Sequence, residues 1–282
     1  MNGFFQLQHE KTNSVTVILL IVLSLGIRFD QLLSQSVSKA GAGAVGILVM
    51  AHGGRGEWNQ AVLEAVKPLQ GHCTAEVAFG MAHPDSLQKA VLQLESRGVN
   101  KIAVVRLFIS GKSFLHATEY FFGRRSDPPK MFAHLHHLAA KETDNNNTNH
   151  NVKDVPDMLN LRSSVVINQN GLIDSDITGD IMVQRVLELS TSPGTKSALI
   201  LAHGAGRDSE NTSVLERMNH IARKVSAAGE FREVRVETLR EDWPEKRKQA
   251  EKRIREFIRQ ESENGGKVIV VPLRVFGFGP YE

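Results

Sequence analysis

The chain has 282 residues, of which 41% are hydrophobic and 23% are charged, and its formal net charge at pH 7 is +3. These values are typical of a soluble globular protein with two domains of moderate size. The basic residues are scattered among acidic ones, without a basic stripe interleaved with aromatic side chains, which argues against nucleic-acid binding. The single cysteine, Cys73, has no internal disulfide partner, so cysteine usage gives no indication of the redox compartment.

An uninterrupted apolar run, VTVILLIVLSLGI, occupies residues 15–27. The run is shorter than the roughly 20 residues that span a bilayer, and its length is typical of the apolar core of a secretory signal. A cleaved signal, an uncleaved membrane anchor and a buried first helix are the three interpretations. Arg28 and Asp30 close the run abruptly, which favours the first two. We therefore expect residues 1–40 to be a signal peptide or an N-terminal membrane anchor. The protein would then be exported or anchored on the periplasmic side, and otherwise cytoplasmic.

Residues 47–54 read ILVMAHGG and organise the rest of the chain. A short apolar run that ends in glycines predicts a buried parallel strand and a sharp turn into a helix. His52 is then placed at the carboxyl end of the strand, which is the edge where open α/β sheets bind ligands.

The same phrase recurs as ALILAHGAG at residues 198–206, which places His203 where the first copy has His52. Two further pairs follow in the same order: EVAFGM with EVRVETLR, and KIAVVRLFISG with KVIVVPLRVFG. Three matched segments in one order predict an internal duplication in which each copy is a β-α-β-α-β unit.

Helical spacing of apolar residues predicts a helix over residues 57–69, which Pro68 would end. A strand over 76–81, a helix over 87–96 and a strand over 101–110 follow. This alternation predicts an α/β fold of two similar flavodoxin-like domains, each a parallel sheet with helices on both faces.

The first domain is expected over residues 45–125, a polar Asn-rich linker over 126–160, and the second, C-terminally short domain over 161–282, with a helix at 180–189. Residues 111–119 form a polar loop after the third strand of the first copy. Because loops that leave parallel strands open on one edge, His52 and His116 are expected to face each other across one crevice. A duplicated chain can pair its halves internally, so either a monomer or a homodimer is expected.

An imidazole has a pKa of about 6.5, so near neutral pH it binds a divalent metal or accepts a proton. Two imidazoles across an open crevice can hold cobalt, nickel or iron and leave coordination positions free. A macrocycle above that metal must lose pyrrole protons, which the same imidazoles can accept.

The combination of Ala-His-Gly, a following asparagine (Asn59 and Asn211), a VAF strand and Leu-Phe-Ile-Ser-Gly before a second histidine resembles the class II tetrapyrrole chelatases. These are the sirohydrochlorin cobaltochelatases, and the two copies resemble the tandem members of that family. The resemblance implies insertion of Co²⁺, or else Ni²⁺ or Fe²⁺, into sirohydrochlorin or a related tetrapyrrole in cobalamin or sirohaem-type biosynthesis, without ATP or another nucleotide.

Carried over by the resemblance, His52 is a metal ligand and proton acceptor, and His116 is the second ligand. The tetrapyrrole site would be lined by Ser110, Gly111, Lys112, Ser113, Phe114 and Leu115. His203 is a further candidate metal ligand. The substrate is rich in carboxylates, so Arg55 and Lys112 are either electrostatic contacts or solvated loop charges.

The chain departs from the family pattern at the carboxylate expected after the second strand. In the first copy only His83 and Asp85 are near, whereas Glu241 and Asp242 follow the second strand of the second copy. The third strand of the second copy leads to no histidine, so one complete site is expected. The alternative function is an exported, non-catalytic protein, derived from a chelatase, that binds a metal or a tetrapyrrole.

Overall fold

The computed structural model describes residues 44–54, 56–129, 156–190 and 193–275. The apolar run at 15–27, Arg55 and the Asn-rich stretch at 141–152 lie outside these ranges. In the described ranges, no helix combines the length and apolar character that a membrane span needs.

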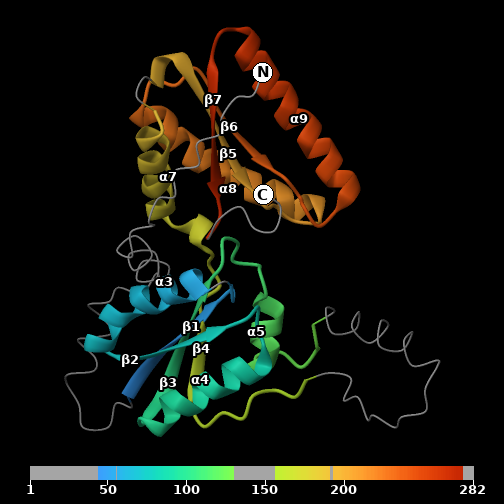
Figure 1. Ribbon diagram of the computed structural model, residues 1–282. Helices are drawn as coiled ribbons and strands as arrows, with labels where there is room; N and C mark the ends of the chain where they lie inside the picture. Colours follow the sequence, from blue (N-terminus) through green and yellow to red (C-terminus); the bar gives the residue numbers. More distant parts are fainter. Residues whose placement is uncertain (1–43, 55, 130–155, 191–192, 276–282) are drawn as a thin grey trace, which may run out of the picture.

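The first lobe is a four-stranded parallel sheet with the strand order β2-β1-β3-β4 (Figure 1). Its elements, in chain order, are β1 (Ala44–Ala51), α3 (Gly56–Val66), the 3₁₀ helix η1 (Lys67–Gly71), β2 (Thr74–Phe79), α4 (Pro84–Ser96), β3 (Val99–Leu107), α5 (Leu115–Phe121) and β4 (Ser164–Ile167).

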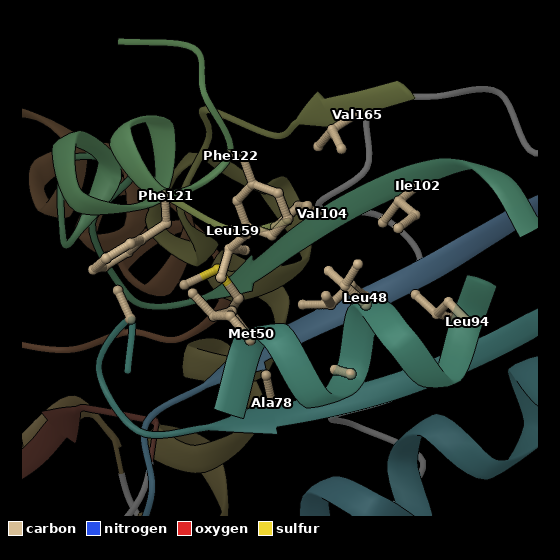
Figure 2. Packing of buried hydrophobic residues seen from close by; sticks show 14 of the residues in the cluster. Leu48, Met50, Ala78, Leu94, Ile102, Val104, Phe121, Phe122, Leu159 and Val165 are labelled. Carbon is tan, nitrogen blue, oxygen red and sulfur yellow. The ribbon is translucent and has the colours of Figure 1, made fainter. Parts of the chain in front are cut away.

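Strand β1 is buried from Gly46 to its end, because helices cover both faces of the sheet. Alternate side chains of a strand point to opposite faces. Leu48 and Met50 therefore pack with α4 and α5, as Figure 2 shows, while Val49 and Ala51 pack on the other face with α3.

The second lobe is a three-stranded parallel sheet with the order β6-β5-β7 (Figure 1). Its elements are η3 (Leu172–Asp174), α7 (Asp176–Glu188), η4 (Pro193–Thr195), β5 (Lys196–Ala202), α8 (Asp208–Ala228), β6 (Val234–Thr238), α9 (Pro244–Glu263) and β7 (Lys267–Leu273). Helices α7 and α8 pack on one face of β5, and α9 lies on the other, where the Ser197 hydroxyl donates a hydrogen bond to Glu261. The strands β1 and β5, which lead into Ala-His-Gly, are both inner strands of their sheets.

Helix α5 begins within the stretch that the sequence predicts as a loop, so His116 lies in the first turn of a helix. Ala117, Thr118, Tyr120 and Phe121 are buried at helical spacing, and this packing stabilises the helix. Phe114, just before the helix, takes a left-handed conformation with φ 53°.

Strand β4 belongs to the first sheet, although its residues fall within the range expected for the second copy. It pairs in parallel with β3, with Ile102 opposite Val165. The chain is fastened to the first lobe just before β4, because the buried carboxylate of Glu95 accepts hydrogen bonds from the backbone N–H groups of Arg162 (2.7 Å) and Ser163 (2.8 Å).

The two lobes meet at the exits of β3 and β7. Leu172 packs in the core beside α3, whereas the next residue, Ile173, packs in the core of the second lobe. Ile109 contacts both cores, and Val275, beyond the end of β7, packs against the first lobe. The carboxyl ends of both sheets are therefore directed toward the junction between the lobes (Figure 1).

Candidate functional site

His52 follows the last residue of β1, as the sequence predicts, and its side chain is exposed. Its Nδ1 lies 2.6 Å from the carbonyl oxygen of Gly53. In the described ranges, its Nε2 has no hydrogen-bond partner. Two contacts from α3 hold the turn: the indole Nε1 of Trp58 donates to the His52 carbonyl (2.5 Å), and the Gly54 N–H donates to Asn59 Oδ1 (3.1 Å). The backbone is fixed while one ring nitrogen remains available.

His116 contacts Asp127, beyond the end of α5. Its Nε2 lies 2.9 Å from the Asp127 carbonyl oxygen and 3.1 Å from Oδ2. Arg125 pairs with the same carboxylate at 3.0 Å and with Glu119 at 3.5 Å. The hydrogen bonds from Arg125 hold the pKa of Asp127 below its usual range. One ring nitrogen of the predicted second metal ligand, Nε2 of His116, is therefore already in contact with Asp127.

His52 and His116 thus have different neighbours. Across residues 44–54, 56–129, 156–190 and 193–275, no three His, Cys, Asp or Glu side chains are grouped so that they could hold a metal ion.

The segment from Ser110 to Leu115 connects β3 to α5 as a tight turn. The Ser110 carbonyl accepts a hydrogen bond from the Ser113 N–H (3.1 Å), and its hydroxyl accepts one from the Lys112 N–H (3.2 Å). The side chain of Lys112 is exposed, and the ring of Phe114 packs on Phe108 with a centroid distance of 5.3 Å. The segment therefore places an aromatic ring, Phe114, and an exposed cationic side chain, Lys112, near the junction between the lobes.

His203 occupies the corresponding position at the exit of β5, and here the structure brings it together with two carboxylates. Its Nδ1 lies 3.2 Å from Glu241 Oε2, and its Nε2 lies 3.1 Å from Asp242 Oδ2. Glu241 is buried and pairs with Arg274, while the ring of Trp243 lies 5.8 Å from that of His203. Sequence reasoning named these carboxylates without assigning them a role.

Burial lowers the pKa of His203 below its ordinary value. Asp242 opposes this shift and Arg274 adds to it. The half-buried ring is therefore mainly neutral near pH 7 and can accept a proton, and Asp242 is placed to stabilise the resulting charge.

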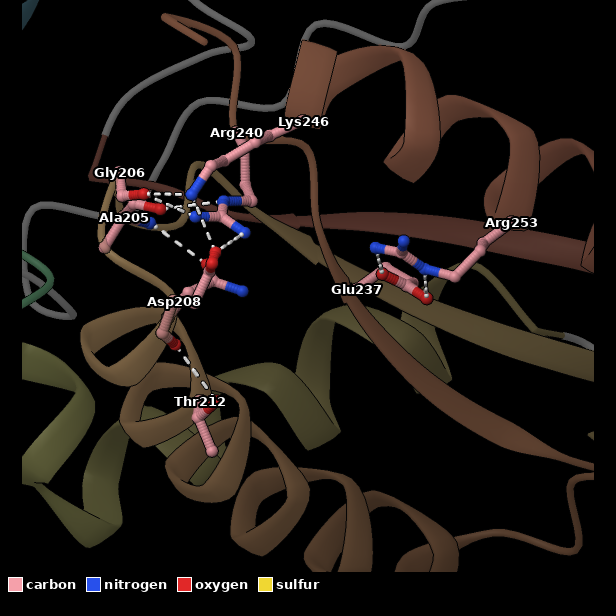
Figure 3. Close-up of polar contacts among 9 residues, drawn as sticks. Ala205, Gly206, Asp208, Thr212, Glu237, Arg240, Lys246 and Arg253 are labelled. Carbon is pink, nitrogen blue, oxygen red and sulfur yellow. Dashed lines mark hydrogen bonds and ion pairs between the residues drawn. The ribbon is translucent and has the colours of Figure 1, made fainter.

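The loop after His203 is held by two cationic side chains (Figure 3). Arg240 Nε donates to the Ala205 carbonyl (2.8 Å) and its Nη2 to the Gly206 carbonyl (2.6 Å), while Lys246 Nζ donates to Gly206 (2.7 Å). Both cations also pair with Asp208, and these contacts hold the pKa of Asp208 below its usual range.

Asn211 repeats the contact that Asn59 makes in the first lobe. Its Oδ1 accepts a hydrogen bond from the Ala205 N–H at 3.1 Å, two residues after His203. The corresponding pair, Gly54 and Asn59, has the same length of 3.1 Å. Each asparagine therefore fixes the turn that carries the strand-exit histidine.

His83 and Asp85 have structural positions at the start of α4. His83 is the residue before the helix, and its side chain makes no capping hydrogen bond. Asp85 lies in the first helical turn, where its charge is favourable to the helix dipole. Neither residue therefore replaces the missing carboxylate of the first lobe by a contact with His52.

Two parallel α/β lobes whose strand exits meet at one junction define the class by fold: an α/β protein of two parallel-sheet domains, as the sequence predicts. Among solved structures, the chain is similar to SirB from Bacillus subtilis with Fe³⁺, with a TM-score of 0.53 and 15% sequence identity over 83% of this chain and 78% of that one. A second similar structure is the sirohydrochlorin chelatase SirB from Bacillus subtilis subspecies spizizenii in complex with cobalt, with a TM-score of 0.46 and 12% identity over 84% and 89% of the two chains.

No protein-family profile and no curated protein sequence matches the chain. The similarity to the first of these structures shows the fold, and a fold alone does not define a function.

Proposed function

We propose that the protein is a metal chelatase that inserts a divalent metal into sirohydrochlorin or a related tetrapyrrole. The metal ion and the macrocycle are both substrates, and no nucleotide takes part. The observation that carries the proposal is the exposed His52 imidazole, whose turn is fixed by Trp58 and Asn59 while Nε2 makes no hydrogen bond to any residue that the structure describes. Cobalt is the first candidate metal, on the resemblance to cobaltochelatases, with Ni²⁺ and Fe²⁺ as alternatives.

In this proposal the two strand-exit histidines have different roles. His52 binds the incoming metal through Nε2, because a neutral imidazole nitrogen is a good ligand for borderline metals. His203 accepts the two protons that the pyrrole nitrogens release as the metal enters, one at a time, and passes each to solvent; Asp242 stabilises its charged form. His116 supplies a second nitrogen only if its contact with Asp127 opens when substrate binds.

Three further expectations belong to this proposal. Residues 15–27 direct the protein to export or anchor it at a membrane. The two similar lobes arise from duplication, so a monomer holds both strand exits, and a homodimer is the alternative. Lys112 attracts the carboxylates of the substrate.

The proposal is tested by mixing the purified full chain with sirohydrochlorin and Co²⁺ and following the absorbance change on metal insertion. His52→Ala is expected to abolish insertion, and His203→Ala to slow it about 10²-fold, the usual contribution of a proton acceptor. His220→Ala is the matched control, since His220 is an exposed residue of α8 far along the chain from either strand exit, and it should retain the wild-type rate. Unchanged insertion in His52→Ala would reject the assignment of the metal ligand.

The second candidate function is a non-catalytic protein that binds a metal or a tetrapyrrole. It is favoured by the engagement of His116 with Asp127. Tight binding of sirohydrochlorin or Co²⁺ by the wild type, with no change toward the metallated spectrum, would support this function instead of catalysis.

A further inference from the structure

Arg106 is a charged residue inside the apolar strand β3, and its side chain is buried, with 1% relative exposure. Its guanidinium donates only to backbone carbonyls among the described contacts. Nη1 donates to Ser113 (2.7 Å) and Nη2 to Gly111 (2.5 Å). On its other side, Nε donates to Asn168 (2.9 Å) and Nη2 also reaches Gln169 (3.2 Å).

These four carbonyls belong to two segments that are far apart in the sequence. Gly111 and Ser113 lie in the turn between β3 and α5, which is the proposed lining of the tetrapyrrole site. Asn168 and Gln169 begin the connector, residues 168–175, which leads from β4 to α7 and so from one lobe to the other. The planar fork of one arginine can bind both segments at once, which a point charge cannot do as well.

The two segments also approach each other closely. A Cβ added to Gly111 would lie 2.3 Å from the Gln169 carbonyl oxygen, and one added to Gly171 would lie 2.3 Å from the Gly111 nitrogen. Only glycine, with no side chain, fits such a backbone contact.

The connector continues from this contact into both cores. The Leu172 N–H donates to the Phe108 carbonyl (2.9 Å), and the Ile173 N–H donates to the Ile109 carbonyl (3.0 Å). Leu172 packs in the first lobe and Ile173 in the second. A movement of the turn after β3 would therefore displace the backbone that joins the lobes.

Among the residues that the structure describes, the second lobe has no arginine at the corresponding position of β7. Arg106 lies opposite Met50 in the sheet register, and the corresponding position opposite Leu201 is Pro272, whose side chain has no donor. Burial lowers the pKa of Arg106 to about 10, so the guanidinium is still charged at neutral pH, and its cost in desolvation is offset by the carbonyl contacts.

We propose that Arg106 is a positioning residue for the proposed chelatase: it fastens the turn at 110–114 to the connector at 168–171 and so holds the proposed tetrapyrrole lining in a fixed position at the junction between the lobes. The inference rests on the proposed function for its substrate, but the mechanical link between the two segments is a property of the chain itself.

The test compares Arg106→Gln, Arg106→Lys and Val62→Ala in the full chain. Val62 is fully buried on α3, in an apolar cluster that contains no residue of 110–114 or 168–171, so its variant controls for a general loss of stability. Amide hydrogen exchange is measured in both segments under native conditions, and kcat and KM for sirohydrochlorin are measured with Co²⁺.

Both Arg106 variants are expected to speed amide exchange at least about tenfold in residues 110–114 and 168–171 together. Without the shared contact, one local unfolding event exposes the backbone of both segments. KM should rise by a larger factor than kcat falls, because the variants displace the proposed lining of the tetrapyrrole site and not the groups that carry out insertion. Val62→Ala should show no such selective exchange.

The proposal would be overturned if either segment of Arg106→Gln exchanged its amide hydrogens at the wild-type rate. It would also be overturned if Arg106→Lys kept the wild-type exchange rates and kinetic constants. If the wild type inserts no metal, the proposed function fails, yet the exchange measurement still decides whether Arg106 links the two segments.

Discussion

Glu241 lies against His203, with 3.2 Å between Oε2 and Nδ1, although 38 positions separate the two residues in the sequence. Parallel pairing of β5 with β6 produces this contact, because Ala202 is in register with Thr238 and both strands end at the same edge. The first lobe has a histidine at the same position but Met81 and Ala82 after its second strand, so the two strand exits differ in charge. This difference is the basis for assigning metal binding to one histidine and proton uptake to the other.

The pKa of His203 should respond to its two charged neighbours in opposite directions. Asp242→Asn removes a charge that favours the imidazolium ion, so it should lower the pKa further. Arg274→Gln removes a charge that disfavours it and should raise the pKa. The measurement is an NMR titration of the His203 ring protons, assigned with His203→Ala. Equal pKa values in Asp242→Asn and wild type would contradict the contact at Nε2.

The matched asparagines should stabilise their turns to different extents. Asn211 is buried, so Asn211→Ala leaves the Ala205 N–H without its partner and should lower the free energy of unfolding by about 1–3 kcal/mol. Asn59 is half-buried, and Asn59→Ala should cost about 0.5–1.5 kcal/mol.

Urea unfolding measures both losses. Asn211→Asp and Asn59→Asp are the controls, because each keeps an acceptor oxygen and should lose less stability than the alanine variant. A larger loss for Asn59→Ala than for Asn211→Ala would contradict the burial that we describe.

Glu95 should make the stability of the first lobe depend on pH. Burial opposes its ionisation, but the hydrogen bonds from Arg162 and Ser163 lower the pKa of Glu95 below its ordinary value. Its carboxylate therefore contributes stability that is present above about pH 4.3, the unfolded value, and is lost as the pH falls through the lower folded value.

At pH 7, Glu95→Gln should lower the free energy of unfolding by about 1–3 kcal/mol, since a charged acceptor is replaced by a neutral one. The difference from wild type should shrink as the pH falls below the folded pKa. Glu263→Gln is the control, because its pair with Arg259 is exposed and should contribute less than about 1 kcal/mol. The prediction would be wrong if the free energies of unfolding of Glu95→Gln and wild type differed by the same amount at pH 7 and at acidic pH.

Much of the fold was predictable because its signals are local. Buried parallel strands require apolar runs, and β1 and β5 have them, while glycines after β1 and β5 mark the turns that carry His52 and His203. Pro68 was expected to end the helix after β1, and the α-helix indeed gives way to a 3₁₀ turn there.

The less predictable features depend on contacts between distant segments. A polar stretch between Gly111 and Glu119 gives no clear helical signal, yet α5 forms because Phe121 and Ala117 find a core beside β1 and α4. The membership of β4 in the first sheet was equally hidden, since it depends on Glu95 and on pairing across a long intervening segment.

The sequence by itself determined the α/β class and the position of a histidine at two strand ends, because buried strands and glycine turns depend on residues that are adjacent in the sequence. Only the tertiary structure decided which side chains those histidines meet: Asp127 for His116, Glu241 and Asp242 for His203, and no acidic partner in the described ranges for His52. The tertiary structure also decided what Arg106 contacts. A buried cation needs several hydrogen-bond acceptors, and only the folding of the chain brings the carbonyls of residues 111, 113, 168 and 169 around it.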